Sequence, residues 1–581
     1  MNKIFKLLNS LFLQVQKNRA KVFLIIASFS WFLSVLAYTI PDGFQMWDLI
    51  NGLTLSFADM PEGNSGWIVA GKLSWMATLA SAIVFTVLKD WLYEKSICWI
   101  TSSRNEKHII VISDDFERTL KSLDKDKHSK ECYKILIINH TINAELKEHY
   151  RSKNIFFVSD IESVVDKTNC EFIIVSNNAE FENIEIAKKL DKENKKTRKK
   201  DIKIYTRINN YNTMTSSISK DEEYTNIIFF NIGMSAARQL FQDSPLSTGL
   251  NTVTEDDRVH LLIIGFGFYG QAILLEAIKL GHFYNNQKMK ITIIHNDDKS
   301  VQSFSKYHNY DSIKDIDIEF KNSDLNSPDF YDQVVNGSKC DATYTYIVMS
   351  LGDSELTQRI LGDLTVKIRQ NEKCKIGKGI PFYVRHNSYI GDKNPNENDL
   401  IFNRETFSKI DTFDKNYEFK NNKLDEKGKA LHETYRDETN PKKIGPWESL
   451  EFYEKDKNFA AADHEVIKLR VIEDLIREYS REEIFEAVSL KNKDKEQHHE
   501  FKNLTEIQQK MIDMEHRRWN AYHYINGWIH GEKRNNDFKI HTCLVDTKKL
   551  EELPQKEQDY YVNDISNWKK AYETHFAKEG V

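Results

Sequence analysis

The stretch His260–Leu280, HLLIIGFGFYGQAILLEAIKL, decides the fold. An aliphatic run, His260–Ile264, leads directly into the glycine pattern Gly265-x-Gly267-x-x-Gly270 and then into a helical segment, Gln271–Leu280. The pattern alone is weak evidence, but its place between a strand and a helix meets its physical requirements. The first glycine makes the tight turn, the second lets a pyrophosphate approach the backbone, and the third lets helix and strand pack closely. Ligand binding at the turn and a purely structural turn both remain open.

The pattern around this turn predicts a parallel sheet with helices on both faces. Short β-branched runs follow at 291–294, 318–320, 344–350 and 381–385. The acid expected to bind a ribose stands about 20 residues after the last glycine. Asp297 is the candidate, although it lies beyond that spacing and His295 occupies the expected place.

An earlier copy of the same unit precedes this one. Its predicted strands are 108–113, 133–139, 154–158, 171–176, 202–206 and 226–231. Where the second copy has glycines, the first has Ser113-Asp-Asp-Phe-Glu-Arg118. Two carboxylates at a helix N-terminus repel a phosphate, so we expect no dinucleotide in the first copy.

The composition narrows the classes of function. The 581 residues leave room for roughly three or four domains. The net charge of -6 argues against a chain-wide nucleic-acid footprint, so we expect no nucleic-acid partner. The six cysteines form no C-x-x-C pair, and we predict neither a disulfide framework nor a metal site.

The first hundred residues predict two membrane spans. Val22–Ile40 carries no charge and gives about 28 Å of helix, close to a hydrocarbon core of about 30 Å. Trp67–Leu88 is broken only by Lys72, which either snorkels to the headgroups or faces a pore. A cleaved signal peptide is the alternative for the first span. Residues 1–21 carry bases without acids and 41–65 acids without bases, which predicts an inner or plasma membrane location with both termini cytoplasmic.

The connection between these spans is apolar enough to dip back into the membrane. The order of span, short helix at Phe44–Ser56, extended return and span resembles the two-helix pore module of tetrameric potassium channels. The Thr-Val-Gly-Tyr-Gly filter is absent, so potassium selectivity is not implied. The pore candidates are Ser56, Asp59 and Glu62, and a ring of the two acids would favour cations. An ordinary hairpin loop is the alternative.

Tandem nucleotide folds after such a module resemble the regulator-of-potassium-conductance (RCK, or TrkA-N) family. The resemblance covers roughly 105–390, with specific residues only at 265–270. It implies Rossmann-like domains that assemble into a ring beneath a channel, as a homo-oligomer with a tetramer favoured. NAD or another adenine nucleotide is the implied cofactor.

The C-terminal segment carries a second group of motifs. His516-Arg-Arg-Trp519, Asn526-Gly-Trp528, Gly531, Arg534 and His541-Thr-Cys-Leu544 resemble the ryanodine-receptor repeat domain. Thr542 departs from the proline usual there, and an earlier copy begins near Leu424 and includes Trp447. Paired copies imply a cleft in which aromatic rings stack a base and an arginine binds a phosphate. The implied ligand-sensing residues are Trp447, His516, Trp519, Trp528, Arg534 and His541. Packing in the core is the alternative role.

The sequence therefore predicts a membrane α module followed by α/β domains with two doubly wound parallel sheets and a mainly helical C-terminal domain. The predicted domains are 1–104, 105–250, 251–390, a linker at 391–423, and 424–581.

No catalytic constellation accompanies these domains, so we do not expect an enzyme. The resemblances imply a ligand-gated membrane pore that senses a nucleotide-derived second messenger, as anti-phage defence effectors do, with the lipid bilayer and a small nucleotide as partners. The alternatives are a housekeeping potassium or cation channel regulated by NAD or ATP, and a membrane-anchored NAD-dependent oxidoreductase.

Overall fold

A computed structural model describes the chain from residue 107 to residue 578, with gaps. The chain divides into two units, 1–105 and 106–581, and every described residue lies in the second. The gaps are 115, 124–131, 138–148, 151–152, 154, 159–169, 198–201, 211–225, 256, 339–343, 375, 377–379, 386–403, 407–422, 440–444, 490–500, 555–556 and 558–559.

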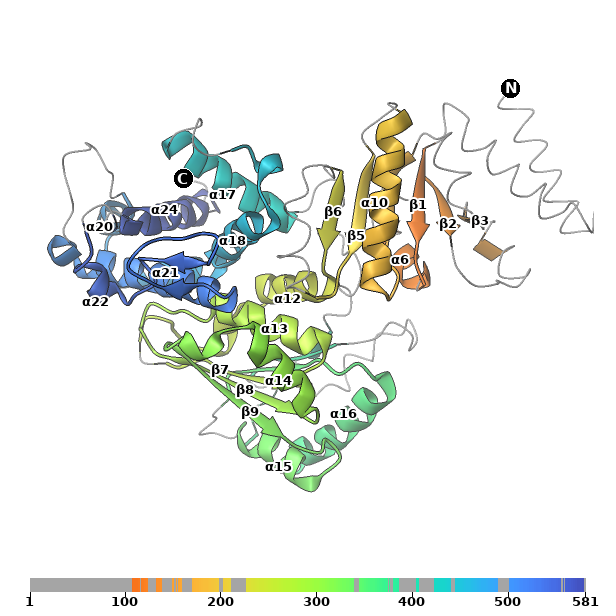
Figure 1. Cartoon of the computed structure of the whole chain (residues 1–581). Coiled ribbons are helices and arrows are strands. Elements are labelled where there is room, and N and C mark those ends of the chain that lie inside the picture. The colour runs from red at the N-terminus through yellow and green to blue at the C-terminus, as the bar shows by residue number, and fades with distance from the viewer. Residues whose placement is uncertain are drawn as a thin grey trace, which may run out of the picture. The chain divides into compact units, whose positions relative to one another are not determined.

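The first sheet has six parallel strands in the order β3-β2-β1-β4-β5-β6 (Figure 1). Its strands are β1 (His108–Ile112), β2 (Tyr133–Ile137), β3 (Ile155–Val158), β4 (Cys170–Val175), β5 (Lys203–Arg207) and β6 (Ile227–Phe230). The helices of this part are α6 (Phe116–Leu123), α10 (Glu180–Thr197) and α12 (Ile232–Asp243). All six strands coincide with predicted runs, which confirms the parallel α/β pattern.

The second sheet repeats this order as β9-β8-β7-β10-β11-β12, again with parallel pairs. Its strands are β7 (His260–Ile264), β8 (Met289–His295), β9 (Ile316–Asn322), β10 (Tyr346–Met349), β11 (Phe382–Val384) and β12 (Arg404–Thr406). Its helices are α13 (Phe268–Leu280), α14 (Asp298–Tyr307), α15 (Pro328–Asn336) and α16 (Ser354–Arg369). The edge strand β12 lies in the segment expected to be a linker, so the sheet is larger than predicted.

Burial explains why these runs form central strands. All five residues of β1 and of β7 are buried, as expected for strands covered by helices on both faces. The order of each sheet is that of the doubly wound dinucleotide-binding fold, in which ligands bind outside the carboxyl ends of the strands where the order reverses. In the second sheet this point lies between β7 and β10.

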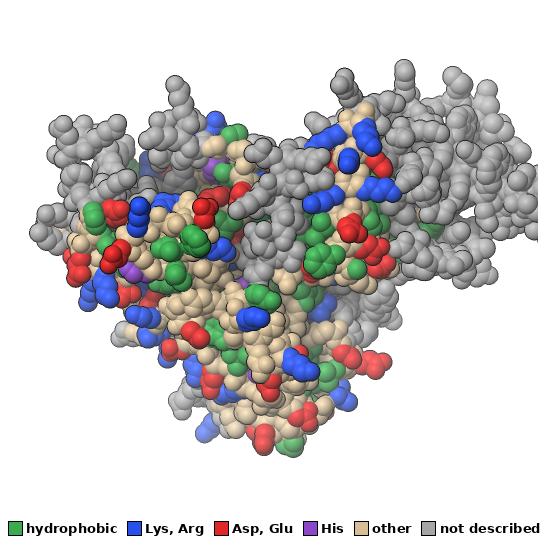
Figure 2. Space-filling view, viewed as in Figure 1, with side chains coloured by type: hydrophobic (Ala, Val, Ile, Leu, Met, Phe, Trp, Pro, Cys, Tyr) green, Lys and Arg blue, Asp and Glu red, His purple; other side chains and the backbone are tan. Residues whose placement is uncertain are grey.

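Helix α10 shows how charge matches helix polarity in this part of the chain. Glu180 and Glu182 stand in its first turn, and Lys195 and Lys196 in its last. Figure 2 shows basic side chains over the upper part of α10 and acidic ones near its lower end. Acids near the N-terminus and bases near the C-terminus both favour the helix dipole.

The C-terminal part is mainly helical, as predicted. Its helices are α17 (Lys423–Thr439), α18 (Phe452–Asp463), α19 (Glu465–Leu475), α20 (Arg481–Val488), α21 (Glu506–Ile525), α22 (Thr547–Leu550) and α24 (Tyr560–Lys578). Thr505 and Gln508 form a capping box that fixes the start of α21. The two-residue strands β13 (Ile529–His530) and β14 (Ile540–His541) pair beyond its end.

The structure corrects the membrane part of the predicted fold class and the predicted location. Among the residues that the structure describes, no helix is both long and apolar enough to cross a membrane. Helices of sufficient length are present, namely α10, α21 and α24, but charged side chains occur along each of them. By this finding, the described part of the chain gives no support to the prediction of a two-span inner- or plasma-membrane protein. The predicted spans 22–40 and 67–88, with Ser56, Asp59 and Glu62, lie outside the described residues.

Candidate functional site

The three glycines at the start of α13 serve three different purposes. Gly265 has a φ of 94°, a conformation that residues with a side chain rarely adopt. A Cβ on Gly270 would lie 2.2 Å from the carbonyl oxygen of Gly265, so only glycine fits there. A Cβ on Gly267 would meet nothing within 4 Å, and its φ of -73° suits any residue. The turn therefore needs glycine at position 265 for its backbone conformation and at position 270 for close packing, while Gly267 faces open space.

The open glycine lies at the carboxyl end of the second sheet, between β7 and β10. Ser350, just after β10, donates a hydrogen bond from its hydroxyl to the carbonyl oxygen of Gly265 at 2.8 Å. Gly267 is also the N-cap of α13, and its side of the turn is where the helix leaves its first N–H groups unpaired. The geometry fits an anion approaching the backbone from above Gly267.

Arg385 adds a positive charge beside this turn and was not among the predicted site residues. It follows β11 directly, is buried, and its guanidinium lies 3.8 Å from the centre of the Tyr269 ring. Its Nη1 donates to the carbonyl oxygen of Leu351 at 3.3 Å. The sequence carried a signal, because a basic residue at the carboxyl end of a central strand points to the ligand side of such a sheet.

Asp297 does not serve as an uncommitted ribose acceptor. It is the N-cap of α14, where one carboxylate oxygen accepts from the backbone N–H of Lys299 at 3.0 Å and the other from the hydroxyl of Ser300 at 2.5 Å. The hydrogen bond from Ser300 is the main reason that the pKa of Asp297 lies below its ordinary value. The buried His295 ends β8, with its Nδ1 3.9 Å from a carboxylate oxygen of Asp298.

In the first sheet, polar side chains occupy the turn after β1, which corresponds to the glycine turn after β7. The hydroxyl of Ser113 donates to the carbonyl oxygen of Ser176 at 3.1 Å, and the carboxylate of Asp114 accepts from the backbone N–H of Asn178 at 3.1 Å. A carboxylate thus stands where the second sheet has its glycine turn.

The structure gathers most of the predicted C-terminal residues into one aromatic cluster, made of Tyr453, His516, Trp519, His523, Trp528 and His541. His516 stacks on Trp519 at 5.7 Å between ring centres. Trp528 stacks on Tyr453 at 5.9 Å with an angle of 22° between the rings. Neither the Trp528 Nε1 nor the Tyr453 hydroxyl has a hydrogen-bond partner among the described residues, and both atoms are buried.

The histidines of this cluster are held by the fold. His516 Nε2 bonds the carbonyl oxygen of Val545 at 3.0 Å, and its Nδ1 lies 3.6 Å from a carboxylate oxygen of Asp564. Burial opposes protonation of His516, but Asp564 raises the pKa of the ring above its ordinary value. Burial, followed by the charge of Arg534, lowers the pKa of His541 to about 4. The contacts of His516 therefore agree with a role in core packing. His541 is uncharged at physiological pH and packs against the other rings of the cluster.

Arg534 and Trp447 lie in different places relative to this cluster. Arg534 is exposed on the loop between β13 and β14, and its Nε donates to the side-chain oxygen of Asn536 at 3.0 Å. Its charge is close enough to affect the pKa values of His541 and Tyr453. Trp447 instead makes ring contacts with His432 at 5.7 Å and Phe459 at 5.5 Å.

The sequence missed Tyr453 and His523 as cluster members. Tyr453 comes from the first turn of α18, and His523 lies one turn after Trp519 on α21. The helical spacing of Trp519 and His523 was a usable signal, because residues four apart share a face. Nothing local linked Tyr453 to a ring 75 positions away in the chain.

Within the described segments, no group of three or more His, Cys, Asp or Glu residues could hold a metal ion. The groups that fit a bound organic molecule are the open glycine turn with Arg385, and the aromatic cluster with Arg534. Comparison with protein-family models and with curated proteins finds no match for this chain.

Proposed function

We propose that residues 106–581 act as a sensor for a nucleotide-derived small molecule, whose phosphate binds at the turn between β7 and α13. The observation that carries this proposal is Gly267, which faces open space at the N-terminus of α13 and at the reversal point of the sheet order. The backbone there can approach a phosphate without a side chain in the way. The pore predicted from the sequence forms no part of the proposal, because the membrane location that it needs is corrected above.

Arg385 supplies the second element of recognition. A guanidinium carries a permanent charge and donates in a fork that matches phosphate oxygens. Here it is held between the Tyr269 ring and the carbonyl oxygen of Leu351, so little side-chain freedom is lost when a ligand binds. An adenine nucleotide, such as NAD, ATP or a messenger derived from them, is the ligand class that this turn suits.

The test is ligand-dependent thermal stabilisation of the full chain by NAD, ATP, ADP-ribose and a cyclic dinucleotide. A ligand at a hundred times its Kd stabilises the folded state by about 2.7 kcal/mol. Gly267→Val should remove the stabilisation, because the branched side chain fills the space that the phosphate needs. The matched control is Gly362→Val, since a Cβ at Gly362 on α16 also meets nothing within 4 Å. Equal stabilisation of both variants would remove the ligand from this turn.

The aromatic cluster supports a second candidate for the sensing site. Trp528 Nε1 and the Tyr453 hydroxyl lack hydrogen-bond partners within the described residues, so an acceptor atom of a ligand could satisfy them. Arg534, exposed nearby, could bind a phosphate of the same molecule. If Arg534→Ala removes the stabilisation and Gly267→Val does not, the ligand binds at the cluster and not at the turn.

A further inference from the structure

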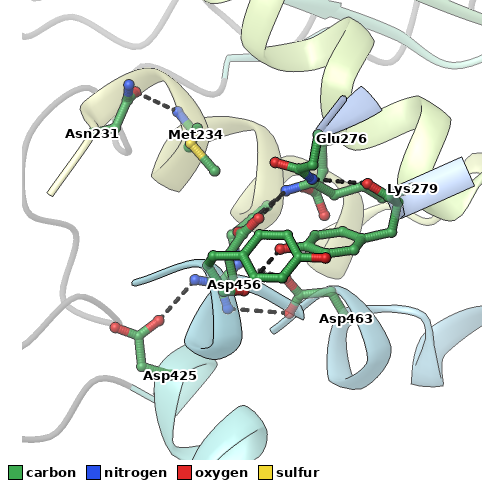
Figure 3. Close-up of polar contacts among 11 residues, drawn as sticks. Asn231, Met234, Glu276, Lys279, Asp425, Asp456 and Asp463 are labelled. Carbon is green, nitrogen blue, oxygen red and sulfur yellow. Dashed lines mark hydrogen bonds and ion pairs between the residues drawn. The ribbon is translucent and has the colours of Figure 1, made fainter. Parts of the chain in front are cut away.

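A buried charge cluster joins α12, which follows the first sheet, and α13 of the second nucleotide fold to the C-terminal helices (Figure 3). Arg238 of α12 donates from Nε to Asp463 of α18 at 2.5 Å and from Nη1 to Asp425 of α17 at 2.7 Å. Lys279 of α13 lies 3.2 Å from a carboxylate oxygen of Asp456 of α18. These contacts tie α12 and α13 to two helices that follow far later in the chain.

The charges in this cluster do not balance. Two cations, Arg238 and Lys279, face four carboxylates, of which only Asp425 has a partly exposed side chain. The fourth carboxylate is Glu276 of α13, one turn before Lys279. Asp425 and Asp463 share Arg238, and Asp456 pairs with Lys279, so Glu276 is the carboxylate left over.

The contacts of Glu276 agree with this count. Its Oε2 lies 3.6 Å from Lys279 Nζ, too far for a hydrogen bond. Its buried Oε1 has no hydrogen-bond partner among the residues that the structure describes. Because an ionised carboxylate without hydrogen bonds is costly to bury, such a group takes up a proton instead.

We propose that Glu276 holds a proton while α13 and α18 are packed together, and that loss of this proton loosens the contact, so that docking of the C-terminal helices depends on pH. The charges with the largest effect on Glu276 lie on the helices packed around it: Arg238 on α12, Lys279 on α13, and Asp456 and Asp463 on α18. From α21, the Tyr522 ring lies 5.9 Å from Lys279 Nζ.

The electrostatics support the geometry. Burial raises the pKa of Glu276 from 4.5 to about 7, the charges of Lys279 and Arg238 oppose the rise, and Asp463 and Asp456 add to it. A carboxyl whose pKa is higher in the folded state stabilises that state only while it is protonated. Its stabilisation is therefore complete below pH 4.5, is lost as the pH rises from 4.5 to about 7, and changes no further above that.

The cluster also lies between the two candidate ligand sites. Helix α13 begins at the glycine turn, and Asp456 stands one turn after Tyr453, which stacks on Trp528. A ligand that shifts α13 would change the proton affinity of Glu276, and the proton would change the ligand affinity by the same factor. This use as a signal rests on the proposed function, whereas the proton-dependent docking does not.

The experiment is hydrogen exchange of the full chain between pH 5 and pH 8, corrected for intrinsic exchange rates and read from peptides of α13 and α18. The opening equilibrium constant of the wild type should rise by between ten-fold and about 70-fold over this range, the upper value following from the shift of the pKa from 4.5 to about 7. Glu276→Gln mimics the protonated side chain and should give a flat profile. Glu486→Gln, at an exposed residue of α20, should behave as the wild type.

The possible results distinguish failure of the proton-dependent docking from failure of the proposed function. A flat wild-type profile, or the same profile in the wild type and Glu276→Gln, overturns the proposal. The wild-type profile alone decides the matter if Glu276→Gln does not fold. Nucleotide-dependent stabilisation is measured separately at pH 5, where most of the proton-dependent stabilisation is still present, so its absence would overturn the proposed function and leave the proton switch standing.

Discussion

Arg238 offers the most direct test of how α12 is tied to the C-terminal helices. Its side chain is only 7% exposed and that of Asp463 only 1%. Its guanidinium also lies 4.5 Å from the centre of the Phe459 ring. Arg238→Met keeps most of the aliphatic volume and removes the charge, so it leaves Asp463 buried without its cation.

The expected loss of stability follows from the unpaired, buried charge of Asp463. Removing one partner of a buried ion pair costs about 3–5 kcal/mol, mainly because the other charge stays buried and unpaired. Asp425 adds little, because its side chain is 34% exposed and can be hydrated. Replacing both partners, in Arg238→Met with Asp463→Leu, should recover most of the loss, since an apolar pair of similar volume is often neutral.

The assay is urea unfolding of the full chain, followed by circular dichroism, for the single and double variants. Lys367→Met is the matched control, because Lys367 and Asp332 form an exposed ion pair at 3.2 Å. Such a pair contributes about 0–1 kcal/mol. If Arg238→Met lies within about 1 kcal/mol of the wild type, or if the double variant is no more stable than the single one, the buried pair does not hold this contact together.

Three other results are expected. Gly270→Ala should lower the melting temperature while Gly267→Ala leaves it nearly unchanged, because only the first would place a Cβ 2.2 Å from the oxygen of Gly265. Arg534→Ala should leave the ligand-free melting temperature unchanged and, if the aromatic cluster is the sensing site, raise the half-maximal ligand concentration about ten- to a hundred-fold. Since burial lowers the pKa of His541 to about 4, stability should fall as the pH drops from 6.5 toward 4, and His541→Gln should show a shallower fall.

Much of the fold was predictable because its signals are local. The strands of the first sheet are short apolar runs, and that pattern alone identifies strands covered on both faces. The edge strand β12 was missed because Arg404–Thr406 has three residues, two of them charged, in a polar segment. Its strand character comes only from pairing with β11.

The candidate sites were predictable only in part, for the same reason. A glycine turn can be predicted from the sequence, because its backbone conformation and close packing require glycine at fixed positions. Gly265, Gly267 and Gly270 were identified in this way. Spacing alone cannot tell a ribose acceptor from a helix cap, and the hydrogen bonds of Asp297 are those of the N-cap of α14. Trp447 was grouped with Trp528 on the strength of a repeat, but it packs with Phe459 instead.

The buried charge cluster could not be predicted from the sequence, because its excess of carboxylates appears only when the charges of several helices are counted together. Glu276 and Lys279, three residues apart, read as an ordinary ion pair on the surface of a helix. In the fold, α18 brings Asp456 and Asp463 against this pair. Lys279 then pairs with Asp456, and Glu276 is left without a close cationic partner. In this environment the protonated carboxyl of Glu276 is more stable than the ionised one. The ionisation of Glu276 can therefore separate α13 from α18. The same reasoning predicts that Asp456→Asn should free Lys279 to pair with Glu276 and thereby lower the pKa of that carboxyl.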